Sequence, residues 1–133
     1  MSLGFLIRRY LLSDYTRLFA MMRLEDDWHG YTDPLTAERY QRALESSIVY
    51  VAILDHHIVA YLRARDDDGF GLYIYDLLVQ KEFRGHQLGK MLIEELARDY
   101  PNGTIYVMSD VDVYYHKQGF TQREGSILVV RDA

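Results

Sequence analysis

The residues best suited to chemistry lie between Asp76 and Lys90, where an apolar run is followed by a glycine-bearing loop and then by an amphipathic segment. The first turn of a helix exposes unpaired N–H groups at its positive dipole end, so a strand, loop and helix in this order can bind a pyrophosphate. Gly85 and Gly89 let the backbone approach such a ligand closely, because they carry no Cβ. Further donors are available from the side chains of Arg84, His86 and Lys90.

Two common phosphate-binding motifs do not account for this loop. A Walker loop requires Ser or Thr directly after its lysine, and here Met91 follows Lys90. The dinucleotide fingerprint of Rossmann folds needs a third glycine and parallel strands, whereas the strands expected before this loop look antiparallel. On the two glycines alone, a helix start that uses glycine for packing is the simpler interpretation.

The loop belongs to a chain of alternating strands and helices. Runs rich in β-branched and aromatic residues predict strands at 7–10, 48–54, 58–64, 70–79, 104–108 and 127–130. Helical spacing, with N-caps at Ser13-Asp14 and at Thr36, predicts helices at 13–23, 36–45, 89–100 and 110–118. The acidic, aromatic segment 24–34 is expected to be a loop. The resulting order, βααβββαβαβ, predicts an α+β fold in which helices pack on a mixed sheet.

The composition limits the classes of protein to consider. With 133 residues, 49% of them hydrophobic, the chain is the size of one domain with an adequate core. A net charge of −5 argues against nucleic acid as a partner, and no apolar stretch approaches the roughly 20 residues of a membrane span. No secretory signal is recognised, so the cytoplasm is the expected compartment.

Cysteine and metal chemistry are not expected. The chain has no cysteine, which excludes disulfides, thiolate zinc sites and a thiol nucleophile. His56 and His57 lie in a predicted hairpin turn and lack further ligands at suitable spacing. The aspartates at 66–68 precede Gly69 in another predicted turn, without the spaced ligands of a calcium loop. We therefore predict no metal site.

A second motif, Tyr115-His116-Lys117-Gln118-Gly119-Phe120, ends the last predicted helix. Gly119 suits the left-handed residue that follows a helix. Taken with Leu77-Leu78-Val79 and the segment from Arg84 to Gly89, in that order, this motif makes the chain resemble the GNAT N-acetyltransferase superfamily over nearly its full length. The resemblance implies a GNAT-like fold, with a largely antiparallel central sheet, a splayed strand pair and helices on both faces. It also implies acetyl-CoA as cosubstrate.

The resemblance further implies which residues bind the cofactor. In the family, a strand ending in Leu-x-Val leads to Arg/Gln-x-x-Gly-x-Gly/Ala, whose amides hold the coenzyme A pyrophosphate. Gln87 stands where the first of these glycines is usual, which is a departure from the pattern. The implied cofactor-binding residues are Leu77, Leu78, Val79, Arg84, Gly85, His86, Gln87, Leu88, Gly89, Lys90 and Tyr115.

The absence of cysteine favours direct attack of an amine on the thioester in a ternary complex, as the resemblance also implies. In the family, N–H groups at Leu78 and Val79 would polarise the thioester carbonyl and hold pantetheine, and Tyr115 would be the general acid for the departing thiolate. Asp76 is the best candidate for the base that accepts the amine proton, and a salt-bridged strand residue is an equally good explanation of it. His29 and Glu25 are alternative bases.

The resemblance places the acceptor pocket at the loop between the first two helices. The expected substrate-binding residues there are Glu25, Trp28, His29 and Tyr31. With Asp26, Asp27 and Asp33 they would form an acidic, aromatic rim that suits a cationic amine, either a small molecule or an amine of a protein. A solvated surface loop is the alternative interpretation.

Other functions and assemblies stay open at this level. A non-catalytic acyl-CoA-binding regulatory module would need the same loop but neither Tyr115 nor a base, so turnover separates it from an enzyme. An α+β scaffold without a cofactor would bind no coenzyme A. The sequence permits a homodimer and identifies neither the acceptor nor the preferred acyl chain.

Overall fold

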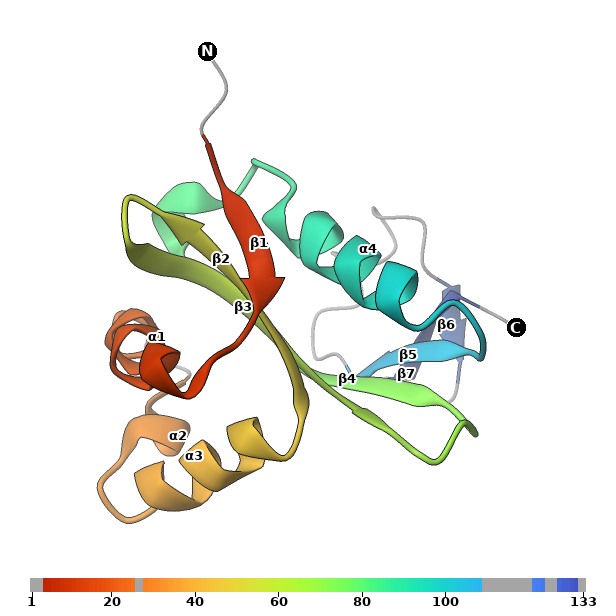
Figure 1. Cartoon of the computed structure of the whole chain (residues 1–133), viewed down its shortest axis with the longest axis horizontal. Helices are drawn as coiled ribbons and strands as arrows, with labels where there is room; N and C mark the ends of the chain where they lie inside the picture. The colour runs from red at the N-terminus through yellow and green to blue at the C-terminus, as the bar shows by residue number, and fades with distance from the viewer. Residues whose placement is uncertain (1–3, 26–27, 109–120, 124–126, 132–133) are drawn as a thin grey trace.

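The computed structural model describes residues 4–25, 28–108, 121–123 and 127–131, and in these residues the strands form one sheet (Figure 1). Its seven strands lie in the order β1-β2-β3-β4-β5-β7-β6. They are β1 (Leu6–Arg9), β2 (Ile48–Leu54), β3 (His57–Asp66), β4 (Leu72–Val79), β5 (Ile105–Met108), β6 (Thr121–Arg123) and β7 (Ile127–Arg131). Neighbouring strands are antiparallel except β4 and β5, which are parallel. The prediction of a mixed, largely antiparallel sheet is confirmed.

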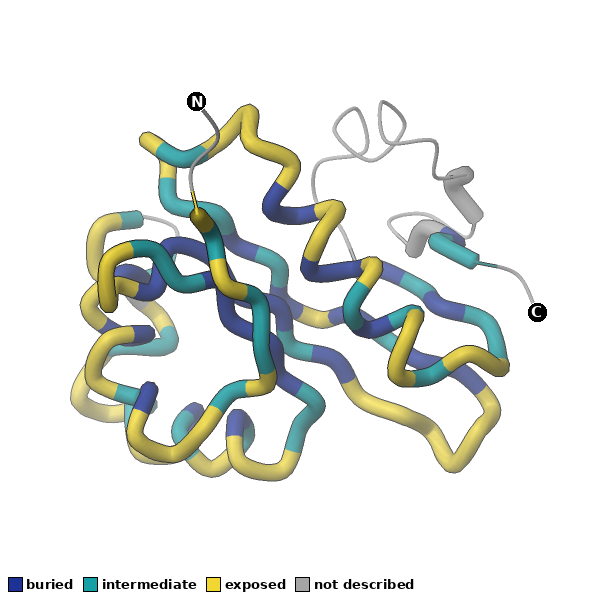
Figure 2. Tube along the Cα trace, turned by 45° about the horizontal axis from the view of Figure 1, so that its top comes forward, coloured by how far each residue is buried: buried dark blue, intermediate teal, exposed yellow. Residues whose placement is uncertain are grey.

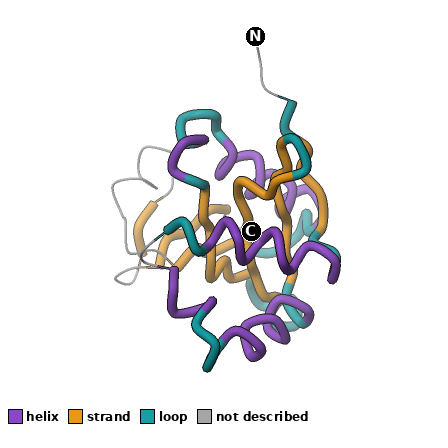
Figure 3. Tube along the Cα trace, turned by 90° about the vertical axis from the view of Figure 1, so that its left-hand side faces the viewer, coloured by secondary structure: helices purple, strands orange, loops and turns teal. Residues whose placement is uncertain are grey.

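Helices cover both faces of this sheet. One face carries α4 (Leu88–Asp99), and the other carries α1 (Tyr15–Met22) and α3 (Ala37–Glu45), with the short α2 (His29–Thr32) between them. Seen from the side in Figure 3, the strands lie between helical segments. Two 3-10 turns, η1 (Leu12–Asp14) and η3 (Lys81–Phe83), follow β1 and β4. None of the helices in the described residues is long and apolar enough to cross a membrane.

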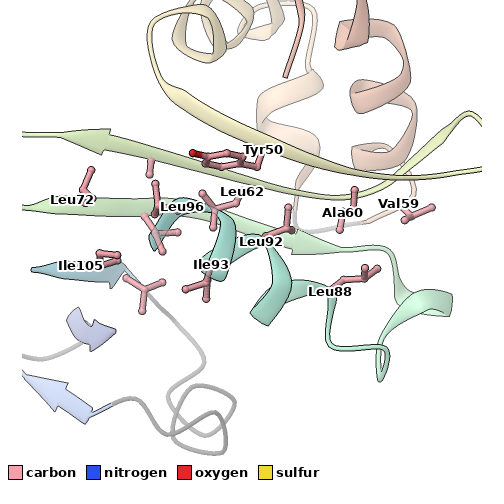
Figure 4. Packing of buried hydrophobic residues seen from close by; sticks show 14 residues of the cluster. Tyr50, Val59, Ala60, Leu62, Leu72, Leu88, Leu92, Ile93, Leu96 and Ile105 are labelled. Carbon is pink, nitrogen blue, oxygen red and sulfur yellow. The ribbon is translucent and has the colours of Figure 1, made fainter. Parts of the chain in front are cut away.

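The core on the α4 face fixes the start of that helix against the sheet. Leu88, Leu92, Ile93 and Leu96 recur at helical spacing and are buried. Figure 4 shows these side chains pointing toward strand residues such as Leu62. Burial of each such side chain stabilises the fold by about 1.5–3 kcal/mol, so the loop that leads into α4 has a firmly held end.

The core on the opposite face holds α1 and α3. Alternation along β2 directs Val49 and Val51 to this face and Tyr50 and Ala52 to the α4 face. Figure 2 shows that buried positions follow the strands and the inner faces of the helices, whereas the outer faces of the helices are exposed. Two helical layers are thus held by one shared set of strands.

A β-bulge in β4 changes which face its second half presents. Arg63 pairs with Asp76 and Ala64 pairs with Ile74, so Tyr75 is an extra residue without a partner on β3. Ile74 packs in the core under α4, and after the bulge Leu78 belongs to the core under α1 and α3. The bulge therefore turns Asp76 toward α1 and α3, which an unbroken alternation from Ile74 would not do.

Several local expectations differ from the structure. Asp14 is not a side-chain cap of α1, because its buried carboxylate accepts hydrogen bonds from Arg8 and from the N–H of Leu11. Thr36 does not cap α3 either; its hydroxyl donates to the carbonyls of Gly30 and Asp33 and so helps to close α2 within the segment expected to be a loop.

The strand boundaries also differ from those expected. The β2–β3 turn has only two residues, Asp55 and His56, both with positive φ, so β3 begins at His57. The three-residue β6 was not predicted. The helix expected at 110–118 lies outside the described residues.

Candidate active site

The connection between β4 and α4, here called the cofactor loop (residues 80–87), has the backbone shape of an anion-binding turn. Gly85 has φ of 92° and Gln87 has φ of 65°, both in the left-handed region that glycine enters freely. Gln87 is the N-cap residue of α4, and its carbonyl accepts the N–H of Met91 at 3.0 Å. The left-handed conformation explains why glycine suits this position. Gln87 adopts the same conformation at a cost of about 1–2 kcal/mol.

The first turn of α4 supplies backbone donors beside this loop. The N–H groups of Leu88, Gly89 and Lys90 lie at the positive end of a 12-residue helix. The side chain of Leu88 is part of the core, so this residue offers only its backbone to a ligand. Arg84, His86 and Lys90 are exposed, and His86 packs against the ring of Phe5 with centroids 5.7 Å apart. The arrangement can bind a phosphate or pyrophosphate group.

The second half of β4 has an open edge in the described residues. The ladder between β4 and β5 joins Leu72–Ile74 to Ile105–Val107, and from Asp76 onward β4 pairs, in the described residues, with β3 alone. Within the described residues, the ladder between β4 and β5 therefore ends at Ile74. The continuation of the chain past Met108, where the expected splay of this pair would be seen, lies outside the described residues.

Strand alternation decides which amides face the open edge. The N–H of Gln80 donates to Val59 of β3 at 2.8 Å, so the N–H and carbonyl of Val79 point away from β3. Arg84 Nε donates to that carbonyl at 3.0 Å, which agrees with this orientation. By the same alternation Leu77 faces the open edge and Leu78 faces β3. The amide pair available to a ligand is therefore Leu77 and Val79, not Leu78 and Val79 as expected.

On the opposite face, Asp76 lies at the centre of a polar cluster. It is 4% exposed. Its Oδ2 accepts hydrogen bonds from Arg63 Nε at 2.6 Å and from the Tyr40 hydroxyl at 2.5 Å, and its Oδ1 accepts one from the Tyr31 hydroxyl at 3.0 Å. The Tyr40 and Tyr61 hydroxyls are 2.7 Å apart. The carboxylate thus has one cationic partner, Arg63, and two neutral hydrogen-bond donors, the hydroxyls of Tyr31 and Tyr40.

Burial and charge shape the ionisation of this cluster. Burial, together with the negative charge of Asp76, raises the pKa values of Tyr31 and Tyr40 above the usual range for a tyrosine. Burial alone would lower the pKa of Arg63, but the charge of Asp76 and the hydrogen bond to it raise that pKa above its ordinary value. At neutral pH the tyrosines are thus neutral hydrogen-bond donors and Arg63 is a cation.

Aromatic rings surround the cluster and form a surface, here called the aromatic wall, made of Trp28, Tyr31, Tyr40 and Tyr61. Tyr31 and Tyr40 are stacked with centroids 4.0 Å apart, and Trp28 meets Tyr61 edge-on at 5.9 Å. Trp28 and Tyr31 are only partly buried, so this wall has an accessible side. Ring faces of this kind attract cations.

The structure separates the residues expected to bind the acceptor. Trp28 and Tyr31 join the aromatic wall, whereas Glu25 faces the cofactor loop: one oxygen accepts the N–H of Lys81 at 3.1 Å and the other lies 3.4 Å from Arg84 Nη2. Asp33 caps a turn by accepting the N–H of Leu35. The side chain of His29 is not described, and Asp26, Asp27 and Tyr115 lie outside the described residues.

Three members of the cluster were not singled out from the sequence. Arg63, Tyr40 and Tyr61 belong to no motif, and they meet Asp76 only through pairing of β3 with β4 and packing of α3 on the sheet. A usable signal was present at Arg63, which is a charged residue inside the apolar run of β3. A buried arginine requires a carboxylate nearby.

The sequence matches the model of the acetyltransferase (GNAT) family over residues 18–120. Among curated proteins it is 28% identical over 113 residues to an uncharacterized N-acetyltransferase, ycf52, of Pyropia yezoensis. That match covers 77% of this chain and 64% of the relative, so the chain spans less than two thirds of the relative's length.

Solved structures share the fold. The PaiA N-acetyltransferase of Thermoplasma acidophilum, in complex with coenzyme A, superposes with a TM-score of 0.71 at 16% identity, covering 96% of this chain and 97% of that one. An aminoglycoside acetyltransferase from an uncultured soil metagenomic sample, in complex with sisomicin, has a TM-score of 0.68 at 25% identity, with 86% and 84% of the two chains covered. The first likeness bears on the fold alone.

Proposed function

Because the chain belongs to the acetyltransferase (GNAT) family, we propose that it transfers an acetyl group from acetyl-CoA to a primary amine. The observation that carries this proposal is the cofactor loop. It joins a strand whose second half has an open edge among the described residues to the N-terminus of α4 through two left-handed residues, Gly85 and Gln87. Such a loop suits a pyrophosphate, and the open edge beside it suits an extended amide chain such as pantetheine.

Different residues of β4, the cofactor loop and α4 would bind different parts of coenzyme A. The backbone N–H groups of residues 88–90 would receive the pyrophosphate, with Arg84, His86 and Lys90 as side-chain donors. Leu77 and Val79 would pair with the pantetheine amides along the open edge. Acetyl-CoA would supply an activated thioester, which these backbone groups of β4 would hold.

The acetyl group would pass directly to the acceptor. The neutral form of the amine would attack the thioester carbonyl carbon, the C–S bond would break, the nitrogen would lose one proton to water or a base, and coenzyme A would leave as a thiolate that takes up a proton. We retain Tyr115 as the proposed donor of that proton, on the resemblance to the family. A direct transfer accords with a chain that has no cysteine to carry the acyl group.

We further propose that the acceptor is a cationic amine. The support is the aromatic wall, whose two partly exposed rings, Trp28 and Tyr31, can attract a cation. A similar protein is named as an aminoglycoside acetyltransferase and is solved in complex with sisomicin, which is compatible with this class of acceptor. A small molecule and a flexible lysine side chain both belong to it.

The first experiment is a thermal unfolding series with acetyl-CoA, coenzyme A and ATP. Ligand at 100 times its Kd should stabilise the protein by about 2.7 kcal/mol, and we expect this shift with both coenzyme A species. Release of coenzyme A is then followed with a panel of amines. Binding without transfer to any amine would favour the regulatory module, and the absence of any shift at millimolar acetyl-CoA would refute the cofactor site.

A matched pair of variants locates the site. Lys90→Glu reverses a charge in the first turn of α4, and Arg98→Glu reverses one in the last turn of the same helix. We expect Lys90→Glu to weaken binding of coenzyme A at least ten-fold, since it opposes an anion at the helix N-terminus. Arg98→Glu should bind nearly as the unmodified chain does.

A further inference from the structure

Most of the hydrogen-bonding capacity of the Asp76 carboxylate is already used. Donors from Arg63, Tyr40 and Tyr31 already meet its two oxygens at 2.5–3.0 Å, and water barely reaches it at 4% exposure. Its two oxygens offer about four lone-pair sites, three of which are occupied, and a proton on the remaining site would neutralise the carboxylate that pairs with Arg63. The position of Asp76 at the bulge is therefore better explained by a structural role, holding the side chains that donate to it, than by a role as general base.

The donors to Asp76 come from separate elements of the fold. Tyr31 lies in α2, Tyr40 in α3 and Arg63 in β3, so one carboxylate ties two helices to the sheet. The four-residue α2 is far too short to be stable alone. Its attachments in the described residues include the Tyr31 hydrogen bond and the stacking of Tyr31 on Tyr40, and Trp28, which directly precedes α2, contacts Tyr61.

We propose that Asp76 is a positioning residue for the acceptor amine: through the hydroxyls of Tyr31 and Tyr40 it holds α2 and the aromatic wall against the bulge at Tyr75. This inference rests on the proposed transfer to an amine. Asp76 then sets the affinity for the acceptor, and the amine proton leaves by a route other than this carboxylate. Arg63 balances the charge of Asp76 and lies over the ring of Tyr40, so a further cation would be attracted by the partly exposed rings of Trp28 and Tyr31.

Because the chain has a single tryptophan, the proposed positioning role of Asp76 can be tested before the acceptor is identified. Trp28 is the only tryptophan and belongs to the aromatic wall, so its fluorescence reports the order of the wall. In Tyr31→Phe, which loses one hydroxyl and keeps the ring, we expect a red-shifted emission maximum and stronger quenching by acrylamide. Asp76→Asn should show the same change in greater measure.

Tyr50→Phe is the matched control. The Tyr50 hydroxyl donates to Asp99 at 2.6 Å on the α4 face, which is a bond of the same kind on the other side of the sheet. We expect this variant to leave the emission and quenching of Trp28 unchanged. Each of the three variants that folds should still bind coenzyme A. If the unmodified chain itself does not bind coenzyme A, that result counts against the proposed function and not against this inference.

Kinetics with spermidine as the amine probe add a second readout. At saturating acetyl-CoA, Tyr31→Phe should raise the KM for spermidine by about three- to ten-fold and change kcat by less than about two-fold. An effect of this size on KM is expected from loss of the single hydrogen bond between Tyr31 and the charged Asp76. Unchanged Trp28 fluorescence in Tyr31→Phe and Asp76→Asn, or a collapse of kcat at unchanged KM, would overturn the proposal. If the unmodified chain does not acetylate spermidine, the fluorescence result decides.

Discussion

The carboxylate of Glu25 lies 3.4 Å from the guanidinium of Arg84, and its other oxygen accepts the backbone N–H of Lys81 at 3.1 Å. The segment after α1 is therefore joined to the cofactor loop. Glu25 was expected to meet the acceptor. Its negative charge instead faces the residues proposed to receive an anion.

Glu25→Gln should tighten the binding of coenzyme A. The change removes a negative charge near the proposed pyrophosphate site and frees Arg84, and partly exposed ion pairs of this kind are worth up to about 1 kcal/mol, which is about five-fold in Kd. Isothermal titration at low and high salt measures it, and the gain should shrink with salt. Glu38→Gln, which removes an exposed carboxylate from α3, is the control. Weaker binding by Glu25→Gln would instead show that Glu25 positions Arg84.

Gln87→Gly should stabilise the cofactor loop. Gln87 has φ of 65° and ψ of 23°, a left-handed conformation that costs a residue with a Cβ about 1–2 kcal/mol and costs glycine nothing. The greater flexibility of glycine in the unfolded chain offsets part of this gain. We expect the free energy of unfolding to rise by up to about 1 kcal/mol in urea titrations. Gln87→Ala keeps the strained backbone and should give no gain, so equal effects of the two variants would contradict the explanation.

Much of the fold could be predicted because it depends on local pattern. The alternation in β2 and the helical spacing of Leu88, Leu92 and Leu96 both follow from burial of one face, which a sequence records directly. The predicted N-cap at Asp14 was wrong because of a contact with another element of the fold. Its carboxylate is taken by Arg8 of β1, and sequence spacing does not show which of two uses of an aspartate prevails.

The site was predictable only where it is continuous in the chain. The cofactor loop is one segment, so its glycines and cations appear together. The cluster around Asp76 is assembled from β3, β4, α2 and α3, and it depends on a bulge at Tyr75 that no residue type announces. Arg63 and Tyr40 could not be assigned to the site without the pairing register.

The stability of the protein should fall at acid pH partly through Asp14. Hydrogen bonds from Arg8 lower the pKa of this carboxyl below its usual range, against the opposing effect of burial. With a lower pKa folded than unfolded, Asp14 contributes stability above its unfolded pKa, and that contribution is lost as the pH falls through the folded pKa. Asp14→Asn should be less stable at neutral pH and should lose less on acidification to about pH 3. Urea unfolding at several pH values measures this, with the exposed Asp67→Asn as a control; parallel curves for Asp14→Asn and the unmodified chain would exclude the assignment.

Removal of one partner of the buried pair between Arg63 and Asp76 should cost far more than removal of an exposed one. The side chains are 13% and 3% exposed and meet at 2.6 Å, so Asp76→Asn leaves the Arg63 cation buried without a counter-charge. Breaking such a pair costs about 3–5 kcal/mol, which is a large part of the 5–15 kcal/mol that holds a typical domain folded.

The comparison is Glu38→Gln, which breaks an ion pair with Arg42 on the exposed side of α3. That change should cost at most about 0.5 kcal/mol. Combining Asp76→Asn with Arg63→Met removes the unpaired charge, so the double variant should be more stable than Asp76→Asn alone, and a double-mutant cycle from urea unfolding gives the coupling. If Asp76→Asn cost no more than Glu38→Gln, the carboxylate would not be held by Arg63 in solution. It would then be free to act as the base for the acceptor amine, and the anchoring of α2 would need another explanation.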